Sequence, residues 1–416
     1  MKAIGSTSSR KVWFVFLSAL FILLCYYPYE FYSVYFLFMP NEFLYSQLMF
    51  LALVALLYIG CRAKRKLPGK VLMIFLMQFT GFALYNNHHG LNLNSYIASL
   101  VQMALPVVMI LWIDSSIGIL NFFKKYNKWI MWMAILGAFT WVLVTFFHYS
   151  PLFSIPDRAD GRIIYNYLFT FNKTDMNDMA NVFCYAGFFD ERGAMGYWGM
   201  FALIFNKLFI QNKKMEYILI ACLLLTFSMG FYFQVIFYIL LFYYSKQGMN
   251  RKLLMTFALI CVIVGAGMTR GTKFNSIYDN SIGRFVEIFE TSQTDKTIAV
   301  STRATLTEAA WDEFVRNPWF GTNKKDDLDL YTDNIYEPLV LYGIVGTPFV
   351  LFPFIWLLFY GLRNNRALFK CMLVVFLGFF HRPFHQSLLY GFILYSLIYI
   401  ILVYNNTSVK IYRTKS

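Results

Sequence analysis

The stretch "VWFVFLSALFILLCYY", residues 12–27, decides the fold class, because it carries no charged side chain over its whole length. The stretch "LMTFALICVIVGAGM", residues 254–268, has the same character. A helix that crosses the hydrocarbon core of a bilayer needs about 20 mostly apolar residues, and apolar runs approaching this length recur along all 416 residues. With 59% hydrophobic residues and a mean hydropathy of +0.53, the chain is predicted to be an all-α polytopic integral membrane protein.

The apolar runs divide into about 12 predicted transmembrane helices within a single membrane domain, residues 1–416. The first run follows three basic residues and lacks a small-residue cleavage site, so we expect a retained anchor rather than a cleaved signal peptide. Residues 215–245 are too long for one span and are divided at "SMG", residues 228–230, where a turn is predicted. The predicted spans are residues 12–28, 43–60, 71–85, 97–113, 129–147, 196–211, 215–230, 231–245, 253–268, 338–361, 371–382 and 387–404.

The distribution of charge predicts the orientation. One set of connecting loops carries 23 Lys and Arg residues, with only Asp114 and Glu216 as acids, whereas the other set carries 13 basic and 20 acidic residues. Cytoplasmic loops are the ones enriched in Lys and Arg, so the first set, with the N- and C-termini, is predicted to be cytoplasmic. The net charge of +14 therefore reports topology, and nothing in it indicates a nucleic-acid partner.

The cysteines do not form the framework of a disulfide-stabilised domain. Four of the six are predicted to lie in or beside spans, away from the outer surface, and Cys184 and Cys25 are the outward ones. Stability on the outer, oxidising side is therefore not expected to depend on disulfide bonds.

Two predicted outer loops are long, at residues 148–196 and 269–337. Loops of this length usually carry function or are disordered. Both are rich in Tyr, Phe, Trp and Ile, which argues against disorder. The function is therefore expected on the outer face, in loops that contain short interfacial helices.

The segment "AVSTRATLTEAAWDEFVRNPWFGTN", residues 299–323, is predicted to form such a helix at about 305–316. Thr305 and Glu308 fit a capping box, and Asn317-Pro318 is expected to end the helix. Trp311 is expected at headgroup depth. Arg303 precedes the cap. It is either a solvated or lipid-contacting charge, or a guanidinium that binds the oxygens of an anionic substrate.

Five features of the second outer loop, taken in order, resemble the O-antigen polymerase/ligase family. They are "STR" at 301–303, Trp311, "NPWFG" at 317–321, "DN" at 333–334 and "YGIVG" at 342–346. The family pattern they resemble runs Ser-x-Arg, Trp, Pro-x-x-Gly, a polar residue with Asn, and Gly-x-x-Gly entering a span.

The first outer loop adds "GFFDERGAMG" at 187–196, which is similar to a stretch that opens a span in Wzy-type repeat-unit polymerases. Two positions depart from the family. Arg192 stands where the polymerases commonly have Pro, and Asp333 stands where the ligases have His. The second departure favours a polymerase over a ligase and leaves the general base unassigned.

The resemblance implies a glycosyltransferase-type polysaccharide polymerase in the bacterial plasma (inner) membrane, with its active site facing outward. An acceptor sugar hydroxyl would attack the anomeric carbon of a donor, and polyprenyl (undecaprenyl) diphosphate would leave. The implied partners are the lipid-linked oligosaccharide donor and acceptor, the bilayer, a chain-length regulator and a flippase. The product would be an O-antigen or a capsule, and no cofactor or metal is implied.

Such chemistry requires cations at the diphosphate and a base at the hydroxyl. Four residues are candidates for catalysis, with the base expected among the carboxylates: Glu191, Asp190, Arg303 and Asp333. Six more are candidates for substrate binding: Arg192, Arg162, Asn334, His381, Arg382 and His385. The adjacent His88 and His89 are expected to point apart and not to share a metal.

Two other classes of protein remain open at this point. A lipid-linked oligosaccharide flippase or other transporter could also have twelve spans, but transporters usually place ionisable residues within the membrane along the pathway. The predicted spans contain almost no such residues: Lys207 and Glu216 lie near cytoplasmic ends, and Asp114 lies at one. A non-catalytic scaffold would leave Arg192 and Arg303 without a role.

Overall fold

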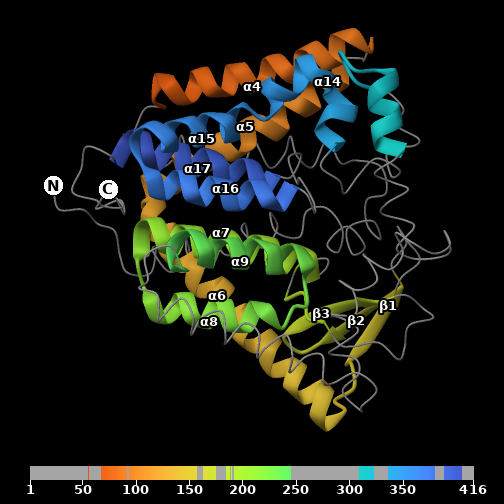
Figure 1. Ribbon diagram of the computed structural model, residues 1–416, viewed down its shortest axis with the longest axis vertical. Helices are drawn as coiled ribbons and strands as arrows, with labels where there is room; N and C mark the ends of the chain where they lie inside the picture. Colours follow the sequence, from red (N-terminus) through yellow and green to blue (C-terminus); the bar gives the residue numbers. More distant parts are fainter. Residues whose placement is uncertain are drawn as a thin grey trace.

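The computed structural model describes residues 67–90, 93–156, 163–174, 184–187, 189, 192–244, 309–322, 336–379 and 388–404, together with residue 55. This part of the chain is mostly helical (Figure 1). Its helices are α4 (Gly69–His88), α5 (Leu93–Ser116), α6 (Ile119–Phe147), α7 (Arg192–Phe205) continued by the π-helical turn η1 (Asn206–Ile210), α8 (Lys213–Leu224), α9 (Met229–Phe242), α14 (Glu337–Val350), α15 (Phe352–Asn364), α16 (Arg366–Phe379) and α17 (Leu388–Tyr404).

These helices overlap nine of the predicted spans, and the other three, residues 12–28, 43–60 and 253–268, lie outside the described residues apart from residue 55. Two of the described helices are long and apolar enough to cross a membrane, Ile119–Phe147 and Arg192–Ile210. A third candidate is the pair α14 and α15, which is bent by 45° at its break. The described part of the chain is thus consistent with a helical membrane protein.

The break predicted near residues 228–230 separates two short helices. α8 ends at Leu224, and α9 begins at Met229 after Ser228, whose hydroxyl accepts a hydrogen bond from the Phe231 N–H. At 1.5 Å per residue the 12 residues of α8 extend only about 18 Å. This is shorter than the hydrocarbon core of about 30 Å.

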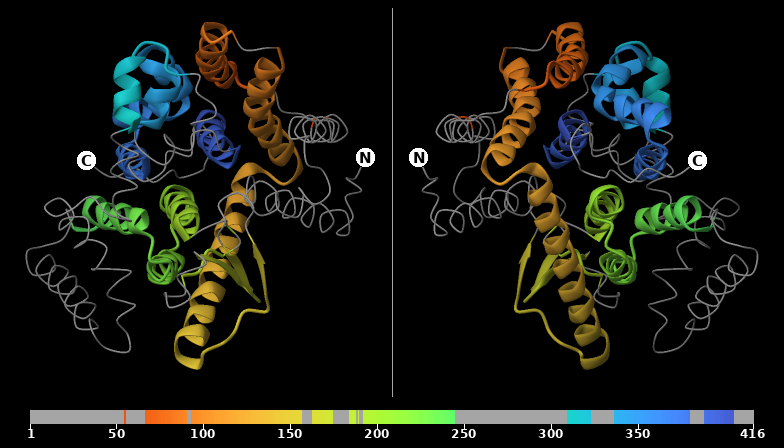
Figure 2. Two further views of the ribbon diagram at one scale, coloured as in Figure 1. Left: turned by 90° about the vertical axis from the view of Figure 1, so that its right-hand side faces the viewer. Right: turned by 90° about the vertical axis from the view of Figure 1, so that its left-hand side faces the viewer.

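The expectation of an all-α chain is wrong in the first long loop. Three strands there form an antiparallel sheet, β1 (Phe153–Pro156), β2 (Ile163–Tyr167) and β3 (Thr170–Thr174), in the order β1-β2-β3. Strands are favoured here because Ile, Tyr, Phe and Thr dominate the segment. The sheet contacts α6 through β3 and lies beside the later part of that helix (Figure 2).

The helices pack in layers around one extended core, with α7 near its centre (Figure 1). Residues 193–205 of α7 are all buried, and α7 packs against α6, α8, α9 and α16. On the other side of α16, α15 and α17 continue the packing to α4 and α5.

One end of the helices, which we call the carboxylate end, buries the side chains of Asp114 and Glu216. Asp114 accepts hydrogen bonds from the hydroxyls of Tyr399 (2.9 Å) and Tyr404, and from the Ile119 N–H (3.1 Å). These bonds tie the ends of α5 and α17 to the start of α6.

Glu216 is held in a second network at the carboxylate end. Its carboxylate lies 3.2 Å from the Lys207 ammonium and accepts a hydrogen bond from the Tyr238 hydroxyl. Lys207 also donates to the Tyr243 hydroxyl at 3.0 Å. Both of these buried acids therefore join helices at this end.

Candidate functional site at the sheet end

The opposite end, which we call the sheet end, carries the sheet, a helix at residues 309–316 and the start of α7 (Figure 1). Here the residues 317–321 pack directly on the α14 segment 342–346. The Ile344 N–H donates to the Pro318 carbonyl at 2.8 Å, and the Val345 N–H donates to the Trp319 carbonyl at 3.1 Å. The segments "NPWFG" and "YGIVG" thus form one structural unit, which we call the docked motif.

Two glycines allow this close approach of two backbones. Gly321 (φ 78°) and Gly343 (φ 63°, ψ −175°) both have left-handed φ values that side chains disfavour. A Cβ atom at Gly321 would lie 2.2 Å from the Leu341 carbonyl oxygen, and one at Gly343 would lie 2.3 Å from the Trp319 carbonyl oxygen. Gly343 also produces the kink inside α14.

The end of α4 completes the docked motif with three side chains. The Tyr85 hydroxyl donates to the Thr322 carbonyl at 3.3 Å, and His89 Nε2 lies 3.4 Å from the Phe320 carbonyl. The His88 ring stacks on the Phe320 ring with centroids 4.4 Å apart. The sequence did not predict that His88 and His89 contact residues 317–322. His89 lies just beyond the last residue of α4, so the direction of its side chain does not follow from helical geometry.

Burial influences the protonation of His89. The loss of hydration lowers the pKa of His89 below its ordinary value, with a smaller contribution from the neighbouring His88 ring, while the contact with the Phe320 carbonyl opposes the shift. The neutral form of His89 is therefore favoured while the docked motif is assembled.

Of the helix predicted at about 305–316, residues 309–316 are described and are helical, and the helix ends just before Asn317-Pro318; the predicted capping box of Thr305 and Glu308 lies outside the described residues. Glu313 in this helix is buried, although charged residues of an amphipathic helix usually face solvent. The Asn317 side-chain amide donates to Glu313 at 2.9 Å, and Arg316 lies 3.8 Å from it. Trp311 is exposed, as a residue at the membrane interface would be in the protein alone.

Arg192 is the first residue of α7 and lies at the sheet end. Its side chain is half-buried, and Nη1 donates to Cys184 Sγ at 2.8 Å. The first N–H groups of a helix have no partner within the helix and carry partial positive charge. The guanidinium and the start of α7 therefore place positive charge in the same region, an arrangement suited to phosphate oxygens.

The sheet is fastened to the chain that leads into α7. The Phe171 N–H donates to the Gly187 carbonyl at 2.9 Å, and the Ala186 N–H donates to the Phe171 carbonyl at 3.0 Å. The Thr170 hydroxyl accepts a further bond from the Gly187 N–H at 2.8 Å. β3 therefore holds residues 186–187, which precede α7 in the chain.

Of the candidate residues, the structure describes Arg192. The candidates Glu191, Asp190, Arg162, Arg303, Asp333, Asn334, His381, Arg382 and His385 lie outside the described residues. Glu191 and Asp190 lie in sequence between the described residues Phe189 and Arg192, and Arg162 lies between β1 and β2. Arg303 precedes the helix at 309–316, and Asp333 and Asn334 precede α14. His381, Arg382 and His385 lie between the end of α16 and the start of α17.

Among the described residues, no three His, Cys, Asp or Glu side chains gather in a group that could hold a metal ion. The described cysteines Cys184, Cys222 and Cys371 are free thiols. The chemistry that the described part of the sheet end offers is thus that of a guanidinium, a helix N-terminus and imidazole rings.

No protein-family model matches the chain, and no curated protein matches it in sequence.

Proposed function

We propose that the chain is a polymerase that joins polyprenyl-diphosphate-linked oligosaccharide repeat units into a surface polysaccharide on the outer face of the plasma membrane. The observation that carries the proposal is the docked motif. Two of the segments on which the family resemblance depends, 317–321 and 342–346, pack on each other through backbone contacts that require glycine. Segments that matched the family by chance would not be expected to meet in this way.

In the proposed reaction, an acceptor hydroxyl oxygen attacks the anomeric carbon of the donor sugar. The bond from that carbon to the diphosphate oxygen breaks, and the electron pair leaves with the polyprenyl diphosphate. A carboxylate takes the hydroxyl proton, and the candidates are Glu191, Asp190 and Asp333. Arg192 and the N-terminus of α7 stabilise the negative charge that develops on the leaving diphosphate.

The carboxylate end argues against a transporter. Apart from Glu313 in the second outer loop, the buried acids of the described residues are Asp114 and Glu216, and both are occupied by tyrosine or lysine side chains near helix ends. A proton- or ion-coupled pathway would use ionisable groups within the membrane. The partly exposed cation Arg192 lies at the sheet end instead.

The function of Arg192 is tested by the variant Arg192→Ala, expressed in cells from which the native gene has been deleted. We expect normal protein level and membrane insertion, but single repeat units in place of long chains, because the leaving diphosphate loses a cation. Arg303→Ala is expected to give the same result. The measurement is the ladder of chain lengths on a gel stained for polysaccharide.

Arg316→Ala is the matched control, because Arg316 is an exposed arginine at the same end of the molecule whose described ion-pair partner is Glu313. It should leave the ladder unchanged. A normal ladder from well-expressed Arg192→Ala would remove this residue from the proposed mechanism.

The class of protein is tested separately by locating the lipid-linked repeat units in the deletion strain. Single units that reach the outer surface are expected for a missing polymerase. Accumulation of the units in the cytoplasmic leaflet would instead show that the chain is a flippase, and the polymerase proposal would fail.

A further inference from the structure

The turn between β2 and β3 has an unusual composition. Tyr167 pairs with Thr170, so that Leu168 and Phe169 form a two-residue loop. Exposed two-residue loops usually carry small polar residues or glycine, such as Asn, Asp and Gly. Here the tip consists of two large apolar residues, and the Leu168 side chain is 60% exposed. Solvation by water does not account for this choice.

More exposed apolar residues lie at the same end of the sheet. Phe153 pairs with Asn166, and the Leu152 N–H donates to the Asn166 carbonyl at 2.8 Å, so both residues are next to the β2–β3 turn. Leu152 and Phe153 are 55% and 50% exposed. Leu152, Phe153 and Leu168, which we call the apolar tip, therefore lie at the same end of the strands.

The apolar tip is at the end of the strands that lies nearer the helices. Phe171 pairs with Asn166 next to the tip and is also bonded to Gly187. A Cβ atom at Gly187 would lie 3.7 Å from the Met133 sulfur, in the middle of α6. The tip is thus close to α6, which is long and apolar enough to cross a membrane.

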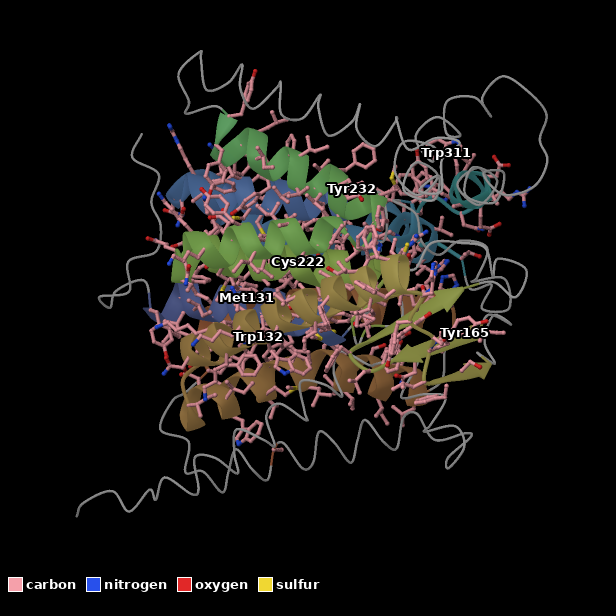
Figure 3. The ribbon with its side chains drawn as sticks, turned by 90° about the horizontal axis from the view of Figure 1, so that it is seen from below. Met131, Trp132, Tyr165, Cys222, Tyr232 and Trp311 are labelled. Atoms are coloured by element: carbon pink, nitrogen blue, oxygen red, sulfur yellow. The ribbon has the colours of Figure 1, made fainter. Side chains whose placement is uncertain are left out.

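α6 also has an exposed apolar face along its length. Trp132, Phe139 and Phe146 are each at least half exposed and follow one another at intervals of seven residues, which places them on one face of the helix. Large apolar side chains on the outside of a spanning helix face lipid. Figure 3 shows Trp132 along the length of the helices and Tyr165 on the sheet at their end.

We propose that the apolar tip inserts into the acyl chains of the outer leaflet, as a continuation of the lipid-facing surface of α6. The partner is a lipid surface, and the inference depends on the membrane placement of α6 rather than on the polymerase reaction. Because β3 is bonded to the segment that leads into α7, insertion of the tip also fixes the depth of Arg192 relative to the leaflet.

The test uses the full-length protein in lipid vesicles, with a nitroxide label on the variant Leu168→Cys. Oxygen partitions into acyl chains, whereas a nickel chelate stays in water, and each changes the relaxation of the label. We expect the ratio of oxygen to nickel accessibility to be several-fold higher for Leu168→Cys than for the control Ser154→Cys. Ser154 is also exposed but lies one residue farther from the tip, on the opposite face of β1.

Labelled wild-type protein supplies the background of the native cysteines, and Phe153→Cys replaces Leu168→Cys if that variant does not fold. A label at either position that is reached mainly by the nickel chelate would show that the sheet stands in water. A label reached by neither agent would show a protein contact, such as a second copy. Either result overturns the proposal without bearing on the polymerase reaction.

Discussion

Polar groups at the two ends of the helices differ in their burial and in their bonding partners. At the carboxylate end, Asp114 and Glu216 are buried and their oxygens are taken up by the side chains of other helices. At the sheet end, the segments are joined by backbone contacts of Gly321 with Leu341 and of Gly343 with Trp319, and Arg192 and His88 are partly exposed. Side chains that bond to one another hold the helices together at the carboxylate end, whereas the sheet end carries a guanidinium and imidazole rings near its surface. The networks that join helices therefore lie at one end, and the proposed function places its ligand at the other.

The largest loss of stability is expected from Glu216→Ala at the carboxylate end. The Lys207 ammonium would remain buried without its carboxylate, and removal of one partner from a buried pair typically costs about 3–5 kcal/mol. The measurement is thermal unfolding of the purified protein in detergent. The double variant Lys207→Met with Glu216→Leu should be less destabilised than Glu216→Ala, because no unpaired charge remains. Equal losses would show that packing, and not charge, holds this end together.

At the sheet end, the corresponding change is Gly343→Ala. The added Cβ would meet the Trp319 carbonyl oxygen, and alanine disfavours the backbone angles of Gly343. Strain and overpacking together should cost about 2–4 kcal/mol, and we expect residues 317–322 to lose their protection from hydrogen exchange.

Two matched glycines separate the causes of this effect. Gly90 has a φ of 60° with open space around it, and Gly69 has neither a positive φ nor a neighbour within 4 Å. Gly90→Ala should therefore report strain alone, and Gly69→Ala should have little effect. If Gly343→Ala is no worse than Gly90→Ala, the contact with Trp319 is unimportant and the docked motif is held by other interactions.

How far the sequence predicts this arrangement differs between the two ends. Apolar runs and turn residues predicted the helices, and the turn near Ser228 was found because "SMG" interrupts a long apolar run. The charge pattern also placed Asp114 and Glu216 near helix ends. Their tyrosine partners, Tyr399 and Tyr238, could not be found in this way, because contacts across helices leave no mark on local periodicity.

The sheet end was harder to predict for two physical reasons. The β2–β3 turn contains Leu168-Phe169 in place of the residues that mark turns, so the segment did not stand out from its apolar surroundings. The docked motif joins residues about 25 positions apart. The glycines can be seen in the sequence, but the backbone contacts that require glycine at these positions cannot. His88 and His89 were set aside because residues adjacent in a helix point apart, although both rings contact Phe320 beyond the end of α4.

A smaller effect at the carboxylate end is expected from Tyr404→Phe, which removes one hydrogen bond to Asp114. A hydrogen bond to a charged group contributes about 1.5–3 kcal/mol, and we expect a loss near the lower limit because Tyr399 and the Ile119 N–H still donate to the same carboxylate. The exposed Tyr217 supplies the control variant Tyr217→Phe. Thermal unfolding that is the same for both variants would show that Tyr404 does not stabilise Asp114.

The smallest expected effect is a pH dependence confined to the sheet end. Burial lowers the pKa of His89 in the folded protein below its ordinary value. The unfolded chain therefore binds the proton more readily, and the contribution of His89 to stability is complete above its ordinary pKa, about 6.5. This contribution decreases as the pH falls through the lower pKa of the folded state. We expect hydrogen-exchange protection of residues 317–322 to weaken in that range while the helices at the carboxylate end stay protected. His89→Gln, which keeps a donor for the Phe320 carbonyl but does not titrate, should reduce this pH dependence. If the variant loses protection with pH as steeply as the wild type, another group governs the docked motif.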